Sequence, residues 1–295
     1  MNTLPKFITC ATTLALSFGL VACGEKSTET NTQATNKAHN SPASAPAAAA
    51  DTMHPVSNFV SKLPENAPVL NVGITGDTAP FSYVNEKGLI EGLDIDVIQD
   101  IAENAGYRVK FSRHSWNDMF ACVEKAECDV AISGISWKPE RAEKYALSNS
   151  YIANPASVMT LDPNLKTLAA LKGMKVGGLD GGKSFDMANS VGASAVTTDK
   201  TPYLAFSRLA RKEVNAIIYD YPVLKHLQNT YPDIKFAINP VESVDSDSAK
   251  TVIMAAKDKT ALIDKINQNL ATLQSSGELE KIKDKWLGNS YTSNS

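Results

Sequence analysis

The segment with the most recognisable chemistry runs from Val176 to Ser184 and reads VGGLDGGKS. From Gly177 onward it matches G-x-x-x-x-G-K-[ST], the phosphate-binding loop of nucleotide-binding proteins. The flanking sequences LKGMKV and SFDMANS predict a strand before the loop and a helix after it. Because backbone N–H groups at a helix N-terminus attract any anion, the motif alone fits a phosphate or a carboxylate equally well.

The N-terminus indicates in which compartment this chemistry takes place. Residues 1–23 read MNTLPKFITCATTLALSFGLVAC, with a lysine before an apolar run from Phe7 to Ala22. That run is too short for a membrane-spanning helix, which needs ~20 strongly apolar residues, and it fits a secretory signal peptide. Its end, LVAC, resembles the lipobox of bacterial lipoproteins. The resemblance implies that Cys23 is acylated, becomes the first residue of the mature chain and anchors it to a membrane.

The composition changes sharply after the leader. Residues 24–66 are rich in Ser, Thr, Asn, Ala and Pro, and such a segment buries too little apolar surface to fold. We predict a disordered tether with a coil span of roughly 35 Å, and a short disordered tail at 291–295. The net charge of −3 and the pI near 5.9 give no sign of a nucleic-acid surface.

Two cysteines remain once Cys10 is removed with the leader and Cys23 is lipidated. Cys122 and Cys128 lie six residues apart, and in an oxidising compartment such an isolated pair favours a disulfide over a metal site. The histidines show no ligand spacing with the cysteines. We therefore expect neither a metal ion nor a cofactor.

The elements that would position these residues alternate between strand and helix. Strands are predicted at 69–75, 107–114 and 128–136, with helices at about 94–104 and 115–127, an order typical of a parallel α/β sheet. A second α/β run follows between residues 168 and 239. The chain ends with a strand at 250–257 and two amphipathic helices, which can return to the first run.

Together with AISGISWKPER at 131–141, these segments resemble the type II periplasmic solute-binding proteins of family 3, the polar amino-acid class that serves ATP-driven importers. The resemblance covers nearly all of residues 68–290. It implies an α/β fold of two lobes joined by two crossover strands that close over a ligand. Lobe one would be 67–153 plus 249–290 and lobe two 154–248, with hinges near 153–157 and 244–249.

The resemblance also implies which residues hold the ligand. The guanidinium of Arg141 would bind the α-carboxylate through two parallel hydrogen bonds, assisted by Ser136. Asp220, from the other lobe, would pair with the α-ammonium, and a carbonyl of Ser133 or Gly134 would accept from the same group. An amino acid would then bridge the two lobes and shift the hinge toward closure.

Other family positions would surround the ligand side chain. Phe81 and Trp116 are expected as aromatic walls, and Thr75 and Thr78 at the distal end. Family members that bind basic ligands usually have an acidic residue where Thr75 stands. The threonine therefore argues against an arginine or lysine ligand, although Asp77 lies close by.

The glycine-rich loop falls where the family has a strand-to-helix turn that faces the ligand carboxylate. Lys183 and Ser184 are therefore expected at the ligand, and the match to a phosphate-binding loop is coincidental, since ATP is scarce outside the cytoplasm. The family usually has a small residue in place of Lys183. Its ammonium group is expected either to point outward or to meet an acidic ligand side chain.

These expectations describe an extracytoplasmic lipoprotein of the periplasm or cell envelope, a monomer that captures a polar L-amino acid and delivers it to an inner-membrane ABC permease. A neutral amino acid is the first choice of ligand and an acidic one the second. No catalytic residue is expected. Two alternatives stay open: a cyclohexadienyl dehydratase-like enzyme, which needs an acid in the cleft, and a sensing or adhesin lipoprotein without transport. Which membrane carries the anchor is also left open.

Overall fold

The computed structural model describes residues 59–288, all within one unit of the chain that spans residues 46–295. The predicted leader, its lipidation site Cys23 and the tail at 291–295 lie outside the described residues, as does most of the predicted tether.

The first sheet is built from two distant parts of the sequence. Its five strands, in spatial order, are β5 (Arg108–Arg113), β1 (Val69–Ile74), β6 (Val130–Ala131), β15 (Met254–Ala256) and β7 (Tyr145–Leu147). β1 pairs in parallel with β5 and β6, whereas β15 runs antiparallel to β6 and β7. The C-terminal part of the chain therefore completes the sheet of lobe one.

Helices and one small sheet complete lobe one. The helices are α1 (Leu93–Asn104), α2 (Trp116–Glu124), α3 (Pro139–Lys144), α7 (Thr260–Ser276) and α8 (Glu278–Leu287); the small sheet contains β2 (Asp77–Thr78), β3 (Ser82–Val84) and β4 (Ile90–Glu91). The side chain of Ser115 caps α2 by accepting from the Asp118 N–H, as its hydroxyl predicts. Gly277, in the left-handed region at φ 76°, separates α7 from α8.

Lobe two has a sheet of its own. Its strands, in spatial order, are β11 (Ala195–Asp199), β10 (Lys175–Leu179), β12 (Ala216–Asp220), β9 (Ala156–Thr160) and β13 (Ala237–Pro240). β10 pairs in parallel with β11 and β12, and β9 runs antiparallel to β12 and β13. The helices of this lobe are α4 (Lys183–Ser190), α5 (Pro202–Ala210), α6 (Tyr221–Thr230) and the 3₁₀ turn η1 (Leu168–Leu171).

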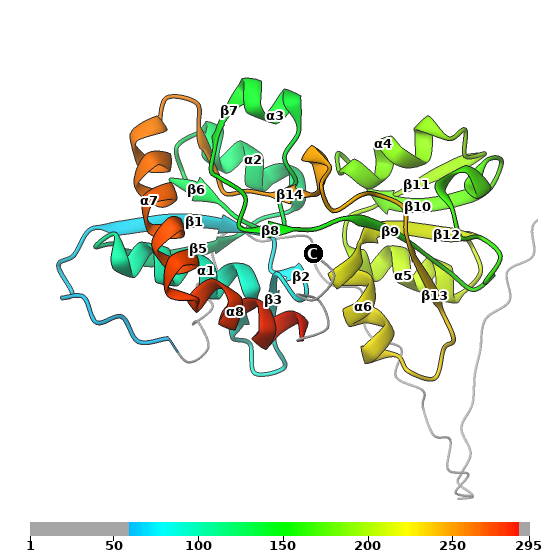
Figure 1. The fold of residues 1–295 in the computed structure, drawn as a ribbon, viewed down its shortest axis with the longest axis horizontal. Helices are drawn as coiled ribbons and strands as arrows, with labels where there is room; N and C mark the ends of the chain where they lie inside the picture. Colours follow the sequence, from blue (N-terminus) through cyan, green and yellow to red (C-terminus); the bar gives the residue numbers. More distant parts are fainter. Residues whose placement is uncertain (1–58, 289–295) are drawn as a thin grey trace, which may run out of the picture. The chain divides into compact units, whose positions relative to one another are not determined.

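Two short strands connect the sheets. β8 (Ile152–Ala153) and β14 (Lys250–Thr251) form an antiparallel pair between the two larger sheets (Figure 1). The 3₁₀ turn η2 (Asp247–Ala249) precedes β14. The chain thus passes from lobe one to lobe two through β8 and returns through β14.

Burial follows the expected apolar pattern of the elements. Val72 and Ile74 of β1 and Ile98 and Ile101 of α1 have no exposed surface and belong to one buried cluster. Fully burying side chains of this size stabilises a fold by about 1.5–3 kcal/mol each. Among residues 59–288, no helix combines the length and the apolarity that a membrane span needs.

The last residues of the predicted tether contact lobe one. Ser61 donates its hydroxyl, and Lys62 its backbone N–H, to the carboxylate of Glu103 in α1, at 2.7 and 2.6 Å. Arg108 donates to the carbonyl of Glu65 at 3.0 Å. Residues 61, 62 and 65 thus contact lobe one through polar groups, which the low apolar content of the segment does not reveal.

Candidate functional site

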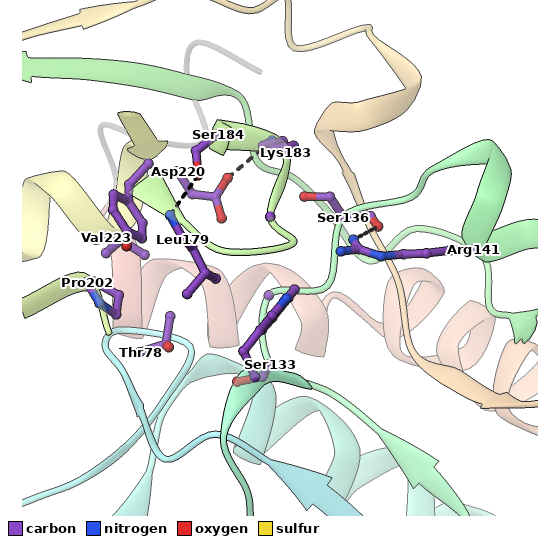
Figure 2. Close-up of a pocket in the computed structure, with 14 residues that line it drawn as sticks. Thr78, Ser133, Ser136, Arg141, Leu179, Lys183, Ser184, Pro202, Asp220 and Val223 are labelled. Carbon is purple, nitrogen blue, oxygen red and sulfur yellow. Dashed lines mark hydrogen bonds and ion pairs between the residues drawn. The ribbon is translucent and has the colours of Figure 1, made fainter. Parts of the chain in front are cut away.

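A cavity lies between residues of the two lobes. Its volume of about 40 Å³ exceeds the ~10–15 Å³ that a single water molecule needs, so it is more than a packing defect. The lining residues are Thr78, Trp116, Ser133, Gly134, Ser136 and Arg141 from lobe one, and Leu179, Gly182, Lys183, Ser184, Pro202, Tyr219, Asp220 and Val223 from lobe two. Figure 2 shows that Arg141 and Asp220 reach this cavity from different elements.

Arg141 is a buried cation of lobe one that is held by uncharged partners. It lies on the short helix α3, which begins at Pro139, and 8% of its surface is exposed. The guanidinium donates to the carbonyl of Ser136 at 2.6 Å and to that of Gly181, in lobe two, at 3.2 Å. Its Cζ lies 5.5 Å from the ring centre of Trp116 and 5.1 Å from that of Phe120.

The charge of Arg141 stays available. Burial lowers the pKa of Arg141 to about 10, which leaves the guanidinium protonated at neutral pH. Within residues 59–288 it forms hydrogen bonds to carbonyls and contacts to rings, and no ion pair to a carboxylate. A planar cation of this kind suits the carboxylate of a ligand.

Lys183 is the second buried cation at the cavity, and acids surround it. It is the first residue of α4, directly after the turn that ends β10. Its Nζ lies 3.2 Å from an Asp220 carboxylate oxygen and 2.9 Å from one of Glu242. The same ammonium group donates to the carbonyls of Asn154 and Ser248, at 2.6 and 3.1 Å.

These ion pairs act on the ionisation of both acids. Burial raises the pKa of Asp220, and the neighbouring Lys183 ammonium works against that rise. Burial also raises the pKa of Glu242, but Lys183 and a hydrogen bond from Ser248 outweigh it, so that pKa lies below its ordinary value. Lys183 therefore favours the ionised form of both carboxylates.

A fully buried acid supports the Gly134 turn. Asp94 accepts from the Gly134 backbone N–H and from the Tyr151 hydroxyl, both at 2.7 Å. Burial raises the pKa of Asp94 to about 7. Gly134 has φ 62°, and a Cβ atom there would lie 3.2 Å from the Phe81 ring, so both the backbone angle and the close packing favour glycine.

Hydroxyl groups cluster at the lobe-one end of the cavity. The Ser133 hydroxyl lies 2.7 Å from that of Thr75 and 2.8 Å from that of Ser82. The hydroxyls of Thr75 and Thr78 are 3.1 Å apart. Of these residues, Thr78 and Ser133 line the cavity, whereas Thr75 lies behind them with 5% exposure.

The structure brings together nine of the eleven predicted ligand residues. Those that line the cavity are Thr78, Trp116, Ser133, Gly134, Ser136, Arg141, Lys183, Ser184 and Asp220. Thr75 and Phe81 do not line it. The Phe81 ring is fully buried against Gly134, because the turn of the chain after β2 directs it into the core and not toward the cavity. The Lys183 ammonium group does not point outward, because it contacts Asp220, Glu242 and the carbonyls of Asn154 and Ser248.

Sequence reasoning missed five lining residues: Leu179, Gly182, Pro202, Tyr219 and Val223. The first two lie inside the glycine-rich motif, and Tyr219 directly precedes Asp220. Residues of the same motif, or next in the sequence, were therefore predicted at the site, although these three were not. Tyr219 is 5% exposed, and its hydroxyl has no hydrogen-bond partner among the described residues. Glu242 was missed as well, because it lies 59 residues from Lys183 in a segment without a motif.

The two remaining cysteines lie in lobe one away from the cavity lining. Cys122 and Cys128 are joined in a disulfide, with their Cα atoms 5.3 Å apart. His114 Nε2 lies 3.7 Å from the Cys128 sulfur, a proximity that the sequence spacing did not suggest. Both sulfurs of this group are bonded to each other, so they offer no thiolate to a metal ion.

Comparison with known proteins adds independent information. The sequence model of the bacterial extracellular solute-binding proteins, family 3, matches residues 70–289. The ABC transporter arginine-binding protein 1 of Escherichia coli K12 is 25% identical over 219 residues, which cover 74% of this chain and 90% of that protein. The L-cystine-binding protein TcyJ of the same strain is 26% identical over 244 residues, covering 79% and 87%.

Solved structures show the same likeness. An ancestral arginine-binding protein bound to glutamine is 27% identical with a TM-score of 0.69, over 75% of this chain and 98% of that one. An ancestral amino-acid-binding protein described as a precursor of cyclohexadienyl dehydratase has a TM-score of 0.66 at 23% identity, over 74% and 95%. The predicted fold class, two α/β lobes of the type II periplasmic binding protein fold joined by two crossover strands, is confirmed.

Proposed function

Because this chain belongs to family 3 of the bacterial extracellular solute-binding proteins, we propose that it captures a polar L-amino acid between its lobes and delivers it to an ABC permease. Its relatives support this proposal, since they are named for binding arginine, cystine or amino acids, and two of these names include an ABC transporter. The relatives from Escherichia coli and Bacillus subtilis are all named as binding proteins.

The observation that carries the proposal is the pair of opposite charges at one cavity. Arg141 presents a guanidinium that has no carboxylate partner among residues 59–288, and Asp220 presents a carboxylate from the other lobe. An L-amino acid has one carboxylate and one ammonium group, and it satisfies both charges only when the two lobes are together. Ligand binding would therefore favour the closed state by the free energy of those contacts.

The backbone around Arg141 supports the same role. The N-terminus of α4, with Gly182, Lys183 and Ser184 at the cavity, directs its first N–H groups toward that region. A ligand carboxylate would meet the guanidinium and these N–H groups together. The crossover pair β8 and β14 would supply the hinge, near residues 153–157 and 244–249.

The N-terminal leader adds a location to this proposal. With its lipobox, it supports a mature protein that Cys23 anchors by lipid to a membrane of the cell envelope. An extracytoplasmic location agrees with the family to which the chain belongs. The folded lobes would act as a monomer that takes up one amino acid at a time.

A binding screen tests the function. The protein, purified with the disulfide intact, is heated with glycine, each of the other standard amino acids in its L- and D-forms, and L- and D-citrulline, and unfolding is followed by fluorescence. At least one polar L-amino acid should raise the Tm, and its D-enantiomer should not. Absence of any shift would contradict the proposal. Turnover of prephenate or arogenate by the same sample would replace it with the dehydratase alternative.

A further inference from the structure

The charged residues that line the cavity, together with Glu242, form two groups of opposite net charge. In lobe two, Lys183 lies between Asp220 and Glu242, and one cation with two carboxylates has a net charge of −1. In lobe one, Arg141 contributes +1. The ammonium and carboxylate groups of an amino acid balance these two groups, provided that the ligand side chain carries no further charge.

The contacts of Lys183 show that groups of the protein balance its positive charge, so that this charge is not available to a ligand. Its ammonium group has three hydrogens, and four oxygen atoms lie within 3.2 Å of it. Only 8% of its surface is exposed. The group is thus saturated by the protein, and it cannot turn to an acidic ligand without breaking two ion pairs.

Charge is also scarce along the rest of the cavity. Asp220 is the only carboxylate among the lining residues, which include two cations. The remaining polar groups are neutral, such as the hydroxyls of Thr78 and Tyr219. Asp94 lies behind Gly134, where burial raises its pKa to about 7. Its two carboxylate oxygens accept hydrogen bonds from the Gly134 N–H and the Tyr151 hydroxyl.

We infer that Lys183 is a specificity-determining residue: it neutralises one of the two negative charges beside the cavity, so that the site accepts an L-amino acid with an uncharged side chain and rejects a cationic one. The inference rests on the proposed function. It sets this chain apart from the arginine-binding relatives that it resembles. A cationic side chain would find no carboxylate among the lining residues besides Asp220, which the ligand ammonium group would occupy, and an unpaired charge in a partly buried site is unfavourable.

The experiment compares two ligands of nearly equal shape. L-Citrulline has a neutral urea group where L-arginine has a guanidinium, so their affinity ratio reports charge. Isothermal titration at pH 7.5 measures both, together with lysine and the tightest uncharged ligand of the screen. The wild-type protein should bind its best uncharged ligand at least tenfold more tightly than arginine or lysine.

Removal of the Lys183 charge should shift this preference. In Lys183→Met, which keeps much of the side-chain volume, the affinity for arginine relative to the uncharged ligand should rise about tenfold. Lys144→Met is the matched control, because Lys144 is also ion-paired, to Glu124, but it is 61% exposed and does not line the cavity. In Lys144→Met, the affinity for arginine relative to the uncharged ligand should not change.

A second variant keeps the test decisive if Lys183→Met does not fold. Glu242→Gln retains the shape and the acceptor oxygen but makes the lobe-two group more positive, so relative arginine affinity should fall about tenfold. Wild-type protein that binds arginine as tightly as its best uncharged ligand would overturn the inference, as would unchanged ratios in the folded variants. In both cases the proposed function stands. Failure of every amino acid to bind would overturn the inference and the proposed function together.

Discussion

The two walls of the cavity each carry a buried cation, but they hold it in opposite ways. On the lobe-one wall, Arg141 contacts two carbonyls and two aromatic rings. On the lobe-two wall, Lys183 contacts two carboxylates and two carbonyls. The first cation is oriented without being neutralised, whereas the second is neutralised in place.

The partners of these two charged residues, more than their types, decide whether the positive charge remains available to an anionic group of the ligand. Carbonyl groups fix the direction of the guanidinium and leave its full charge for a new anion. Carboxylates take up the charge of the lysine and in return stay ionised themselves. Both cations line one cavity, yet of the two charged side chains we expect only that of Arg141 to bind the ligand.

The largest effect should come from Arg141→Met. A ligand carboxylate would lose its charged partner, and we expect binding to weaken by about 4 kcal/mol, or roughly a thousandfold. Titration calorimetry with the ligand from the screen measures the loss. Arg211→Met is the matched control, because Arg211 is exposed and pairs with Glu213 in lobe two; it should bind normally. Unaltered affinity in Arg141→Met would remove the contrast between the two walls.

Lys183→Met should instead act mainly on stability. It leaves Asp220 and Glu242 buried without their cation, and we expect a loss of about 3 kcal/mol in the free energy of unfolding at pH 7. Because the Glu242 pKa lies below its ordinary 4.5 in the folded state, its contribution is present above that pH and is lost as the pH falls further. Urea denaturation should show the variant approaching the wild type in acid. An equal loss at every pH would contradict the ion-pair explanation.

Asp94 gives a third, smaller effect on the lobe-one wall. Its pKa of about 7, against an ordinary 3.8, means that the folded state holds a proton that the unfolded state releases between these values. Stability should therefore decrease as the pH rises, by about 2 kcal/mol from pH 5 to pH 7. Asp94→Asn, which resembles the protonated acid, should lack this decrease when unfolding is measured at both pH values. A variant with the wild-type slope would show that another group titrates.

The smallest effect is expected for Tyr219→Phe on the lobe-two wall. The hydroxyl is buried without a partner among the described residues, so its removal should change the free energy of unfolding by less than about 0.5 kcal/mol. If it bonds the ligand side chain, affinity should fall by about fivefold, which corresponds to one hydrogen bond. Comparison of Tm with and without ligand separates the two quantities. A large loss of stability in the free protein would contradict the role at the cavity.

Local sequence patterns predicted helices and strands, and matched motifs predicted the two oppositely charged residues of the site, Arg141 and Asp220. The helix near 94–104 follows from apolar spacing and is present. Arg141 and Asp220 line one cavity as the family resemblance implied. These features depend on neighbours in the sequence or on matched motifs.

Contacts between distant segments could not be predicted in this way. The partners of Lys183 come from residues 29, 59 and 65 positions away, and no local pattern joins them. An aromatic residue such as Phe81 fits either a cavity wall or the core, so its type does not distinguish the two. Its packing against Gly134, a residue distant in the sequence, places it in the core. The binding of Ser61 to Glu103 depends on a similar long-range contact.

All four uncharged acceptors of the two buried cations are main-chain oxygens, from Ser136, Gly181, Asn154 and Ser248. A carbonyl stays in place whatever side chain its residue carries. Tolerance to random substitution should therefore be uneven across this network: positions that contribute only a main-chain oxygen should accept more amino acids than 141 and 183, which should accept almost none. Drift among natural sequences would then alter the surroundings of the cations long before it alters how they are held.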